Sequence, residues 1–449
     1  DSPWCCGGCP MRRRRAMSVL VSLGVAAAAL TATALPGSAG ASAPSQQFPP
    51  VDQPGVTSTE IKVGGVVSKT NPLGGEYAGA FDGVKAYFNM VNASKDKGIY
   101  GRKLTLGSER DDQLANNRQE AQALLSEDNV FAVLPVASLL FTGADVLGQS
   151  GVPTFGWNIN AEWGSEQAPG PPNLFGEKGS FLCFTCANAL GPLFAKTIKA
   201  KKIGVLAYTV PQSADCAKGV QASFQKYPSA KIEVIDTSLS FGVTDVSGPV
   251  SEMKDKGVDL VTTCMDNNGT LTVAKEMKKQ GLDAIQYLPN SYNQKFIQEN
   301  AQFFQGSYAL TFFTPFEVQP KPKGLKDFQK WMKKGGFEQN ENAMSGWISA
   351  DMFYQGLKAA GPDFTRQKVI DAVNANTDYT ANGLLGGINW QTAHQQDATN
   401  GCVVLSKIQN GKFKPAFGQP GKPFVCYPNQ PDKLPAKFVP AAGVAGFGQ

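Results

Sequence analysis

Strand-like apolar runs alternate with helix-like amphipathic stretches along this chain, and this alternation restricts its possible folds more than any other feature. The first series starts at Glu60 and contains four apolar runs separated by three stretches with helical periodicity. The apolar runs cover 61–67, 103–107, 130–136 and 152–155, and the helical stretches cover 77–91, 117–125 and 140–147. Strands that alternate with helices predict a parallel sheet with helices on both faces.

A second series of the same kind follows a break. Residues 157–179 are rich in Gly and Pro and have no periodicity. The pattern then resumes with helical stretches at 188–199, 217–227, 250–256 and 271–280, and with apolar runs at 203–207, 232–235, 259–263 and 284–288. The second series is not a recognisable sequence repeat of the first. Two series of similar size predict an α/β protein with two Rossmann-like lobes, each with a parallel central sheet.

The pattern changes again after Phe316. Helical stretches at 325–333, 345–360 and 366–375 are followed by apolar runs at 383–390, 402–409 and 412–417. The last two runs flank Asn410-Gly411, which is the strongest two-residue signal for a β-hairpin. The residues after Pro428 are rich in Pro, Ala and Gly, so we expect 428–449 to be a flexible tail without a core.

The breaks in the pattern define the expected lobes. Lobe one would contain 57–180 and 314–378, and lobe two would contain 181–313 and 379–427. The chain then passes between the lobes three times, near 179–184, 311–316 and 379–383. Loop residues at such crossings absorb the backbone changes of a hinge that closes on a ligand.

The first 41 residues, 1–41, contain the three parts of a secretory signal. Four arginines, Arg12 to Arg15, precede an alanine-rich segment at 18–35, and the small-residue sites Ala39-Gly40-Ala41 and Ala41-Ser42-Ala43 follow. A transmembrane anchor is the alternative, but the segment is only about 18 residues long and weakly apolar. We expect cleavage after Ala41 and a protein that is secreted or held in the cell envelope.

Length and charge argue against one class of partner. The chain has 449 residues, with 42 Lys and Arg against 37 Asp and Glu. Four of the basic side chains belong to the leader, so the remainder is close to charge balance. A nucleic-acid binder carries a concentrated basic face, and nucleic acid is therefore not an expected partner. The processed chain is long enough for two core-forming domains, and we expect a monomer.

Cysteine usage is consistent with export. Six cysteines follow the leader, namely Cys183, Cys186, Cys216, Cys264, Cys402 and Cys426. An even number in an exported protein favours disulfides. Cys402 and Cys426 bracket the predicted hairpin and are the first choice for a pair, whereas the pairing of the other four stays open. Cys183 and Cys186 form a CxxC that also suits a redox site or half of a metal site, but no second CxxC exists and His394 is the single histidine of the chain.

The motifs of the common enzyme classes do not occur in this sequence. It has neither the GxGxxG nor the GxxxxGK[ST] pattern that holds nucleotide phosphates. His394 lies in a polar loop without a nucleophile elbow nearby, so we interpret it as an exposed loop residue. The acidic pair Asp111-Asp112 alone does not support a glycosidase. We therefore predict no enzyme, no cofactor and no metal.

Several short motifs occur in a fixed order along the chain. They are IKVGGVVS at 61–68 with NPL at 71–73 and Gly79-Ala80, YGRKL at 100–104, DDQ at 111–113 and NGKF at 410–413. Each is weak alone, but together they resemble the branched-chain amino acid-binding family (Leu/Ile/Val-binding protein-like) of the type I periplasmic binding proteins. The members of that family are the solute receptors of ABC importers. The resemblance covers about 57–427 and implies two lobes joined by a three-crossover hinge.

The resemblance also implies a ligand site between the lobes. Open α/β sheets generally bind ligands at loops that follow the carboxyl ends of strands. Position by position, the implied ligand contacts are Tyr77, Ala137, Ser138, Trp157 and Asn158 in the first lobe, and Tyr208, Gln212, Asp266 and Asn290 in the second.

Three of these residues have a role that can be argued physically. Ser138 precedes a helical stretch, so its hydroxyl and the free backbone N–H groups suit a ligand carboxylate, unless Ser138 is only the N-cap. Trp157 follows a buried strand and either walls a pocket or packs in the core. Asp266 is the nearest candidate to neutralise a ligand ammonium group.

Asn290 departs from the family pattern. Amino acid-binding members usually carry Glu or Asp after the fifth strand of the second lobe. An amino acid ligand would then need Asp266 or Glu76 as a substitute. Aromatic acids, amides and other small organic solutes suit the same scaffold.

These observations predict an extracellular solute-binding protein of an ABC importer. It would capture a small amino acid-like or aromatic solute in the cleft between the lobes and deliver it to a membrane ABC permease. A ligand-sensing receptor domain that signals to a membrane partner without transport is the alternative. An exported hydrolase on this fold is a third possibility.

Overall fold

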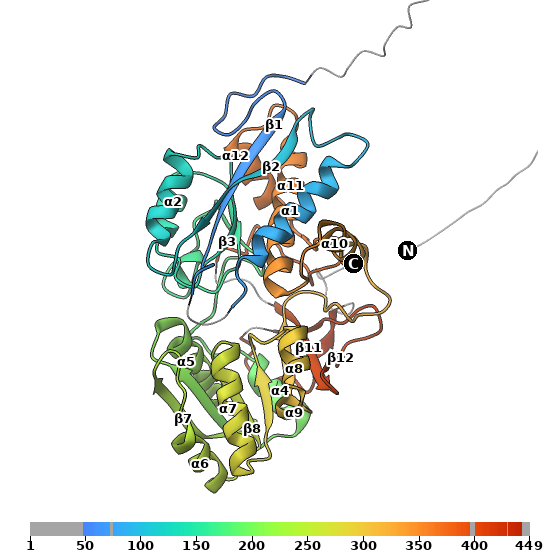
Figure 1. Cartoon of the computed structure of the whole chain (residues 1–449). Coiled ribbons are helices and arrows are strands. Elements are labelled where there is room, and N and C mark those ends of the chain that lie inside the picture. The colour runs from blue at the N-terminus through green and yellow to red at the C-terminus, as the bar shows by residue number, and fades with distance from the viewer. Residues whose placement is uncertain (1–47, 72–74, 396–399, 429, 442–449) are drawn as a thin grey trace, which may run out of the picture. The chain divides into compact units, whose positions relative to one another are not determined.

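The computed structural model describes residues 48–71, 75–395, 400–428 and 430–441, so the predicted leader lies outside the described residues. The body of the chain forms two α/β lobes, each built on its own sheet (Figure 1). The predicted fold class is therefore confirmed. No helix in the described ranges is both long enough and apolar enough to cross a membrane.

The first sheet has five parallel strands in the order β2-β1-β3-β4-β5. The strands are β1 (Glu60–Val67), β2 (Lys103–Asp111), β3 (Val133–Ala137), β4 (Thr154–Gly156) and β5 (Leu174–Gly176). β3, β4 and β5 are buried throughout. Burial on both faces explains why the inner strands appear in the sequence as continuous apolar runs rather than as alternating patterns.

Helices cover both faces of the first sheet. The helices are α1 (Gly79–Asn92), α2 (Asn117–Ser126), α3 (Ala144–Gln149), α10 (Lys323–Gly335), α11 (Glu341–Ala360) and α12 (Arg366–Asn374), with a short 3-10 turn at Ala161–Trp163. One core cluster, which includes Phe155 and Phe353, joins α1, α11 and α12 to the sheet. A second cluster, which includes Val133 and Leu147, joins α2 and α3 to the other face.

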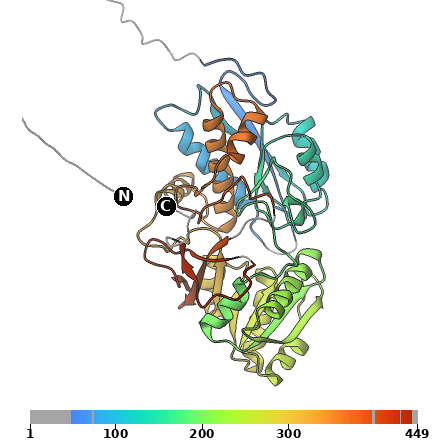
Figure 2. The same ribbon diagram turned by 180° about the vertical axis from the view of Figure 1, so that it is seen from behind.

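α1 and α11 lie against each other along their lengths in both views (Figures 1 and 2). Two glycines permit this close approach. A Cβ atom at Gly83 would lie 1.9 Å from the carbonyl oxygen of Ala343, and one at Gly346 would lie 1.9 Å from the carbonyl oxygen of Ala80. The packing of the two helices thus requires residues without a side chain at these positions.

The second sheet continues the pattern with five parallel strands in the order β7-β6-β8-β9-β10. They are β6 (Lys202–Tyr208), β7 (Lys231–Leu239), β8 (Leu260–Cys264), β9 (Ile285–Leu288) and β10 (Tyr308–Thr311). α4 (Leu190–Ile198) and α5 (Pro211–Lys226) pack on one face, and α6 (Ser247–Asp255) and α7 (Asn267–Gln280) pack on the other. Two short helices, α8 (Gln294–Glu299) and α9 (Ala301–Phe304), precede β10.

Antiparallel strands extend the second sheet beyond β10. β11 (Asn400–Gln409) pairs with β10, with β12 (Lys412–Ala416) and with β13 (Val425–Pro428), and β13 pairs with β14 (Val439–Pro440). Asn410 and Gly411 connect β11 to β12, so the predicted hairpin is present. Cys402 and Cys426 are opposite each other in the β11–β13 ladder and form a disulfide.

The chain passes between the lobes three times. It leaves the first sheet after β5 and enters α4 of the second lobe. It returns after β10 to α10, which packs on α1. It leaves again after α12 and joins the second sheet as β11.

Four local features differ from the sequence-based expectations. β5 lies inside the stretch for which we predicted no regular structure. The run at 383–390 forms only isolated bridges, from Leu385 to Phe313 and from Ile388 to Tyr379. The helix expected to start at residue 140 starts at Ala144. The expected free tail instead contributes β14 and the buried side chain of Phe438 to the second lobe.

Candidate functional site

A large cavity of about 970 Å³ is lined by residues of both lobes. Its wall includes residues that directly follow strands of the first sheet, such as Trp157 after β4 and Glu177 after β5. It also includes residues that follow strands of the second sheet, such as Asp266 after β8 and Asn290 after β9. The carboxyl ends of both sheets therefore face this space, as in other open α/β sheets that bind ligands. Its volume is in the range of cavities that enclose small organic ligands.

The structure brings together seven of the nine residues that the resemblance implied. The residues that line the cavity are Tyr77, Trp157, Asn158, Tyr208, Gln212, Asp266 and Asn290. Ala137 and Ser138 do not line it, although both are buried nearby at the end of β3.

The hydroxyl of Ser138 is hydrogen-bonded within the first lobe. Its hydroxyl accepts a hydrogen bond from Nδ2 of Asn117 at 2.8 Å, and the Oδ1 atom of Asn117 accepts one from the backbone N–H of Gly143 at 2.8 Å. Because α3 begins only at Ala144, no free helix N-terminus follows Ser138 directly. The N-cap role that we considered for Ser138 is wrong, and we do not include Ser138 or Ala137 in the proposed site.

Two aromatic side chains form one part of the first-lobe wall. The rings of Tyr77 and Trp157 lie 5.6 Å apart with an interplanar angle of 33°. Both side chains are buried and belong to the same small core cluster. Trp157 thus combines the two roles that the sequence left open, because it packs in the core and lines the cavity.

Asn158 positions the turn that follows β5. Its Nδ2 atom donates a hydrogen bond to the carbonyl oxygen of Gly179, and its Oδ1 atom accepts one from the N–H of Lys178 at 3.3 Å. These bonds fix the backbone next to Glu177, so Asn158 shapes the wall through its neighbours.

In the second lobe, Asp266 is held by neighbouring groups. The hydroxyl of Tyr208 donates a hydrogen bond of 2.6 Å to Oδ1 of Asp266. As the N-cap of α7, the same carboxylate accepts hydrogen bonds from the backbone N–H groups of Asn268 and Gly269. Burial, together with the hydrogen bond to Asp266, raises the pKa of Tyr208. With three donors already bound, Asp266 is a poorer acceptor for a ligand ammonium than the sequence indicated.

Gln212 connects the two lobes. Its Nε2 atom donates hydrogen bonds to Oδ1 of Asn160 at 3.0 Å and to the carbonyl oxygen of Leu139 at 3.4 Å. Gln212 lies in the first turn of α5, whereas Leu139 and Asn160 follow strands of the first sheet. This contact therefore spans the cavity between its two walls.

Sequence reasoning missed three charged residues of the cavity wall, Glu177, Lys178 and Glu341. The Oε1 atom of Glu177 lies 3.8 Å from Nζ of Lys178, and this Nζ lies 4.1 Å from the ring centre of Phe312. Burial raises the pKa of Glu177. Burial and the nearby Glu177 raise the pKa of Glu341 to about 8, against an opposing effect of Lys178.

Two local sequence features could have placed Glu177 at a strand end and Glu341 at a helix start. Glu177 follows the apolar pair Leu174-Phe175, and Asn340 is a typical N-cap immediately before Glu341. Asn340 accepts a hydrogen bond from the N–H of Ala343 and donates one to Oε2 of Glu76 at 3.3 Å. The residues that precede α1 and α11 thus meet at the cavity.

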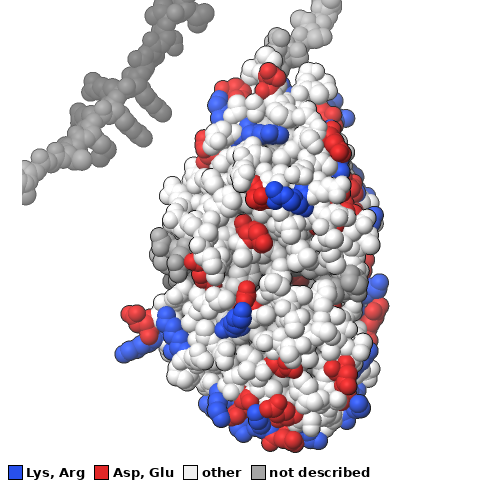
Figure 3. Space-filling view, turned by 90° about the vertical axis from the view of Figure 1, so that its left-hand side faces the viewer, with Lys and Arg blue, Asp and Glu red and all other residues white. Residues whose placement is uncertain are grey.

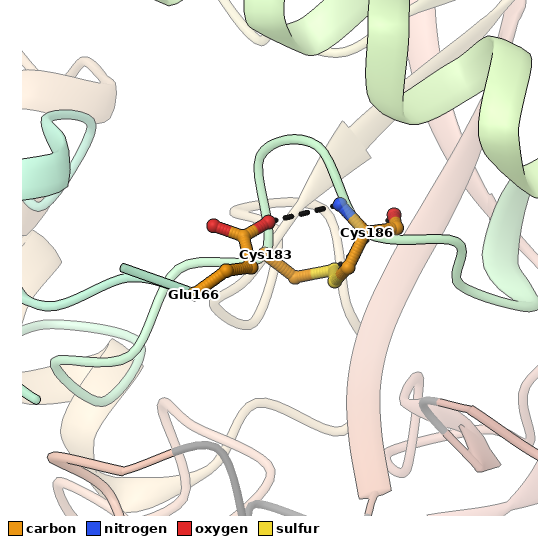
Figure 4. A group of neighbouring side chains, drawn as sticks. All are labelled: Glu166, Cys183 and Cys186. Carbon is orange, nitrogen blue, oxygen red and sulfur yellow. Dashed lines mark hydrogen bonds between the residues drawn. A yellow bond between two sulfur atoms is a disulfide. The ribbon is translucent and has the colours of Figure 1, made fainter. Parts of the chain in front are cut away.

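Four more cysteines lie at the cavity wall or beside it. Cys216 of α5 and Cys264 at the end of β8 form a disulfide, and so do Cys183 and Cys186 in the crossing after β5. In Figure 4 the carboxylate of Glu166 faces the CxxC loop. Its Oε1 atom accepts hydrogen bonds from the N–H groups of Thr185 at 2.7 Å and Cys186 at 2.9 Å.

This arrangement favours a structural role for the CxxC over a redox or metal role. Free N–H groups and positive charges lower the pKa of a reactive cysteine, but here Glu166 takes up the N–H groups and adds a negative charge. The two sulfur atoms and Glu166 have the spacing of a metal site. However, the sulfur atoms are bonded to each other, which leaves no thiolate to bind a metal.

His394 is not the exposed residue that we expected. It is buried beside Phe175 and Trp390, and its Nε2 atom lies 2.9 Å from Oδ1 of Asn374. Burial lowers the pKa of His394 to about 4. The residue has a packing role at the edge of the first lobe.

Comparisons with known proteins agree with this architecture. A family model described as periplasmic binding protein matches residues 60–412. The comparison with curated proteins finds no match. One similar solved structure is a branched-chain amino acid ABC transporter protein from Thermus thermophilus with bound valine, with 14% identity, coverage of 80% of this chain and 96% of that chain, and a TM-score of 0.67.

Two further structures are similar to the same extent. One is a solute-binding protein of an ABC transporter from R. palustris in complex with benzoate, with 15% identity, coverage of 80% and 95%, and a TM-score of 0.61. The other is a fatty acid ABC transporter substrate-binding protein from Thermomonospora curvata, with 16% identity, coverage of 82% and 94%, and a TM-score of 0.63. At these identities the likeness shows the fold, whereas the family model spans most of the chain. The chain belongs to the periplasmic binding protein family and has its type I fold.

Proposed function

We propose that this protein is the exported solute-binding component of an ABC importer and delivers a small organic solute to a membrane permease. The cavity between the two sheets carries this proposal, because its wall is made of strand ends from both lobes that are joined by three crossings. Closing such lobes on a ligand is the usual mode of hinge-type binding proteins. Membership of the family supports the same reading.

The wall chemistry fits an organic solute rather than an inorganic ion. Aromatic side chains from both lobes line the cavity, among them Trp157, Phe181, Tyr208, Phe241 and Phe312. Such rings bury apolar surface and fix its orientation. The similar proteins carry valine, benzoate or fatty acid in their descriptions, and they are transport proteins, so the receptor alternative is not favoured.

A melting-temperature screen of the processed protein against a broad solute library tests this function. A ligand at 100 times its Kd adds about 2.7 kcal/mol of stability. Trp157→Ala should weaken the binding of any hit about tenfold or more, because it removes one aromatic wall. Trp331→Ala is the matched control, since Trp331 lies on α10 and does not line the cavity. A screen without a single stabilising solute would contradict the proposal.

A further inference from the structure

We infer that the solute carries a compact organic cation, such as a protonated amine, and that the first lobe receives it between Glu177 and Glu341. This inference rests on the proposed function and deepens it by assigning a charge to the solute and a place to that charge. It differs from the sequence-based expectation, which assigned an ammonium group to Asp266 in the second lobe.

The charged side chains of the cavity wall are unbalanced. The described wall contains four carboxylates, Glu76, Glu177, Asp266 and Glu341, and the single cation Lys178. Neither Arg nor His occurs among these wall residues. When these carboxylates are ionised, an anionic solute would meet more negative than positive charge, whereas a cationic solute would reduce the imbalance and favour the ionised forms.

Two of the four carboxylates already have hydrogen-bond donors. Asp266 is bound by the Tyr208 hydroxyl and by two backbone N–H groups. Glu76 accepts a hydrogen bond from Asn340. Glu177 and Glu341 are the two other carboxylates of the described wall.

Glu177 has a buried carboxylate oxygen that lacks a hydrogen-bond donor in the described part of the chain. Its side chain is 4% exposed, and its Oε2 atom is buried without a hydrogen bond from any described residue. Its other oxygen lies 3.8 Å from Nζ of Lys178. The neighbouring hydroxyl of Ser345 lowers the pKa of Glu177 against the larger effect of burial. A buried carboxylate oxygen without a donor costs stability, so a donor supplied by the ligand would be favourable.

Glu341 lies close to the same place. It shares Lys178 with Glu177, since both residues affect the pKa of Glu341. Tyr77 also lines the cavity, and its pKa is raised mainly by burial, with additional contributions from Asp266 and Glu341. Lys178 is thus the cation of the described wall that influences both first-lobe carboxylates, and a cationic ligand group would favour the ionised form of Glu341.

The aromatic side chains of the first-lobe wall also favour an organic cation on the solute. The Tyr77 and Trp157 rings lie next to each other in the first-lobe wall, and organic cations bind favourably to such ring faces. Lys178 already makes a contact of this kind with Phe312.

The test compares solutes that share an apolar body and differ in charge. One set is 2-phenylethylamine, 2-phenylethanol, phenylacetate and phenylalanine, and a second set is 3-methylbutylamine, 3-methylbutanol, 3-methylbutanoate and leucine. Each is measured by calorimetry and by melting temperature on the wild type, on Glu341→Gln and on Glu177→Gln. Glu162→Gln is the control, because Glu162 is exposed and lies outside the cavity wall. The broad library of the melting-temperature screen is measured in parallel.

We expect the amine-bearing member of a set to bind best, and Glu341→Gln to weaken it about tenfold or more while Glu162→Gln leaves it unchanged. Below about pH 8 the affinity of the wild type for an amine should fall by up to about tenfold per pH unit, because Glu341 must lose a proton. The same fall should be smaller in Glu341→Gln.

A neutral or anionic solute that binds as tightly as its amine counterpart overturns the inference, and so does amine binding that Glu341→Gln leaves unchanged. Either result leaves the proposed function intact, because a solute still binds. If no solute of any charge binds, the proposed function fails and the inference fails with it. Should Glu177→Gln not fold, Glu341→Gln alone decides the outcome.

Discussion

The second-lobe wall of the cavity and the first-lobe wall differ in what their polar groups contact. In the second lobe, Asp266 is bound by Tyr208 and by the first turn of α7, and the disulfide of Cys216 and Cys264 ties α5 to the end of β8. In the first lobe, Glu177 has a buried oxygen without a donor, and Glu341 shares one lysine with it.

The difference indicates that the two walls of the cavity have different roles in binding. A carboxylate whose hydrogen bonds are complete, such as that of Asp266, keeps its position whether or not a solute is bound. The same wall also contains one buried acceptor without a donor among the described residues, Oδ1 of Asn267. A wall that contains an unsatisfied carboxylate gains more from a ligand that completes it. Mutations in the second lobe should therefore lower stability first, and mutations of the first-lobe carboxylates should change binding first.

The charges outside the cavity do not show this asymmetry. Figure 3 shows acidic and basic side chains interspersed over the visible face. Several form short-range pairs on one helix, such as Lys256 with Glu252 and Lys279 with Glu276. Exposed pairs of this type contribute little to stability.

Removal of the Cys216–Cys264 disulfide should have the largest effect. The bond closes a loop of 48 residues, and the chain-entropy relation gives about 4 kcal/mol for a loop of this length. The double variant Cys216→Ala/Cys264→Ala should lose this amount of unfolding free energy in urea. Cys183→Ala/Cys186→Ala is the comparison, with an expected loss of about 2 kcal/mol because its loop is much shorter. Equal losses would show that loop length does not determine the contribution.

The contact of α1 with α11 supports the first-lobe wall, because both helices begin at the cavity. Gly346→Ala should destabilise the protein by about 3 kcal/mol, since the new Cβ would lie 1.9 Å from the carbonyl oxygen of Ala80. Gly248→Ala in α6 is the matched control, because no atom lies within 4 Å of its Cβ position. That control should be neutral or slightly stabilising, as alanine favours a helix. Chemical denaturation of both variants measures the difference, and equal stability would contradict the close packing.

Most of the fold was predictable because its strands are buried. β1, β6 and β8 lie between helices, so each appears in the sequence as a continuous apolar run bounded by turn residues. β5 was missed because it has only three residues and lies in a Pro- and Gly-rich segment. Phe438 was missed because one apolar residue in a Pro-rich tail gives no periodic signal, although it packs in the second core.

The site was predictable in position and less so in chemistry. Tyr77, Trp157 and Asn290 line the cavity because strand ends meet there, which the resemblance implied. The sequence did not show that Asp266 accepts a hydrogen bond from the Tyr208 hydroxyl, since 58 residues separate the two. It also did not show Glu341 as a wall residue, because the predicted helix began four residues too late.

The pH dependence of stability gives a third test of the two walls. The pKa of Glu341 is raised to about 8 by burial and by Glu177, so the folded state holds this proton at pH values at which the unfolded state has lost it. The contribution of Glu341 to the free energy of unfolding is therefore fully present below about pH 4.3 and is lost as the pH rises to about 8. Glu341→Gln cannot ionise and should therefore be more stable than the wild type at pH 9.

Urea unfolding of both proteins at pH 5, 7 and 9 measures this effect. The advantage of Glu341→Gln should grow over this range, while Glu162→Gln, which changes an exposed carboxylate, should follow the wild type at each pH. A constant difference between Glu341→Gln and the wild type would show that Glu341 ionises normally in the folded protein.

The smallest expected effect concerns the second-lobe wall. Tyr208→Phe removes the hydroxyl that donates to Asp266, and the loss of one hydrogen bond to a charged group should cost about 1–2 kcal/mol of unfolding free energy. Asp266 keeps its two backbone donors, and Glu177 and Glu341 are untouched, so the affinity for an amine should change by less than about threefold. Calorimetry and urea unfolding on the same preparation separate the two quantities. A large loss of amine affinity without a loss of stability would place the cation at Asp266 instead, and the contrast between a preformed second wall and a ligand-completed first wall would then be reversed.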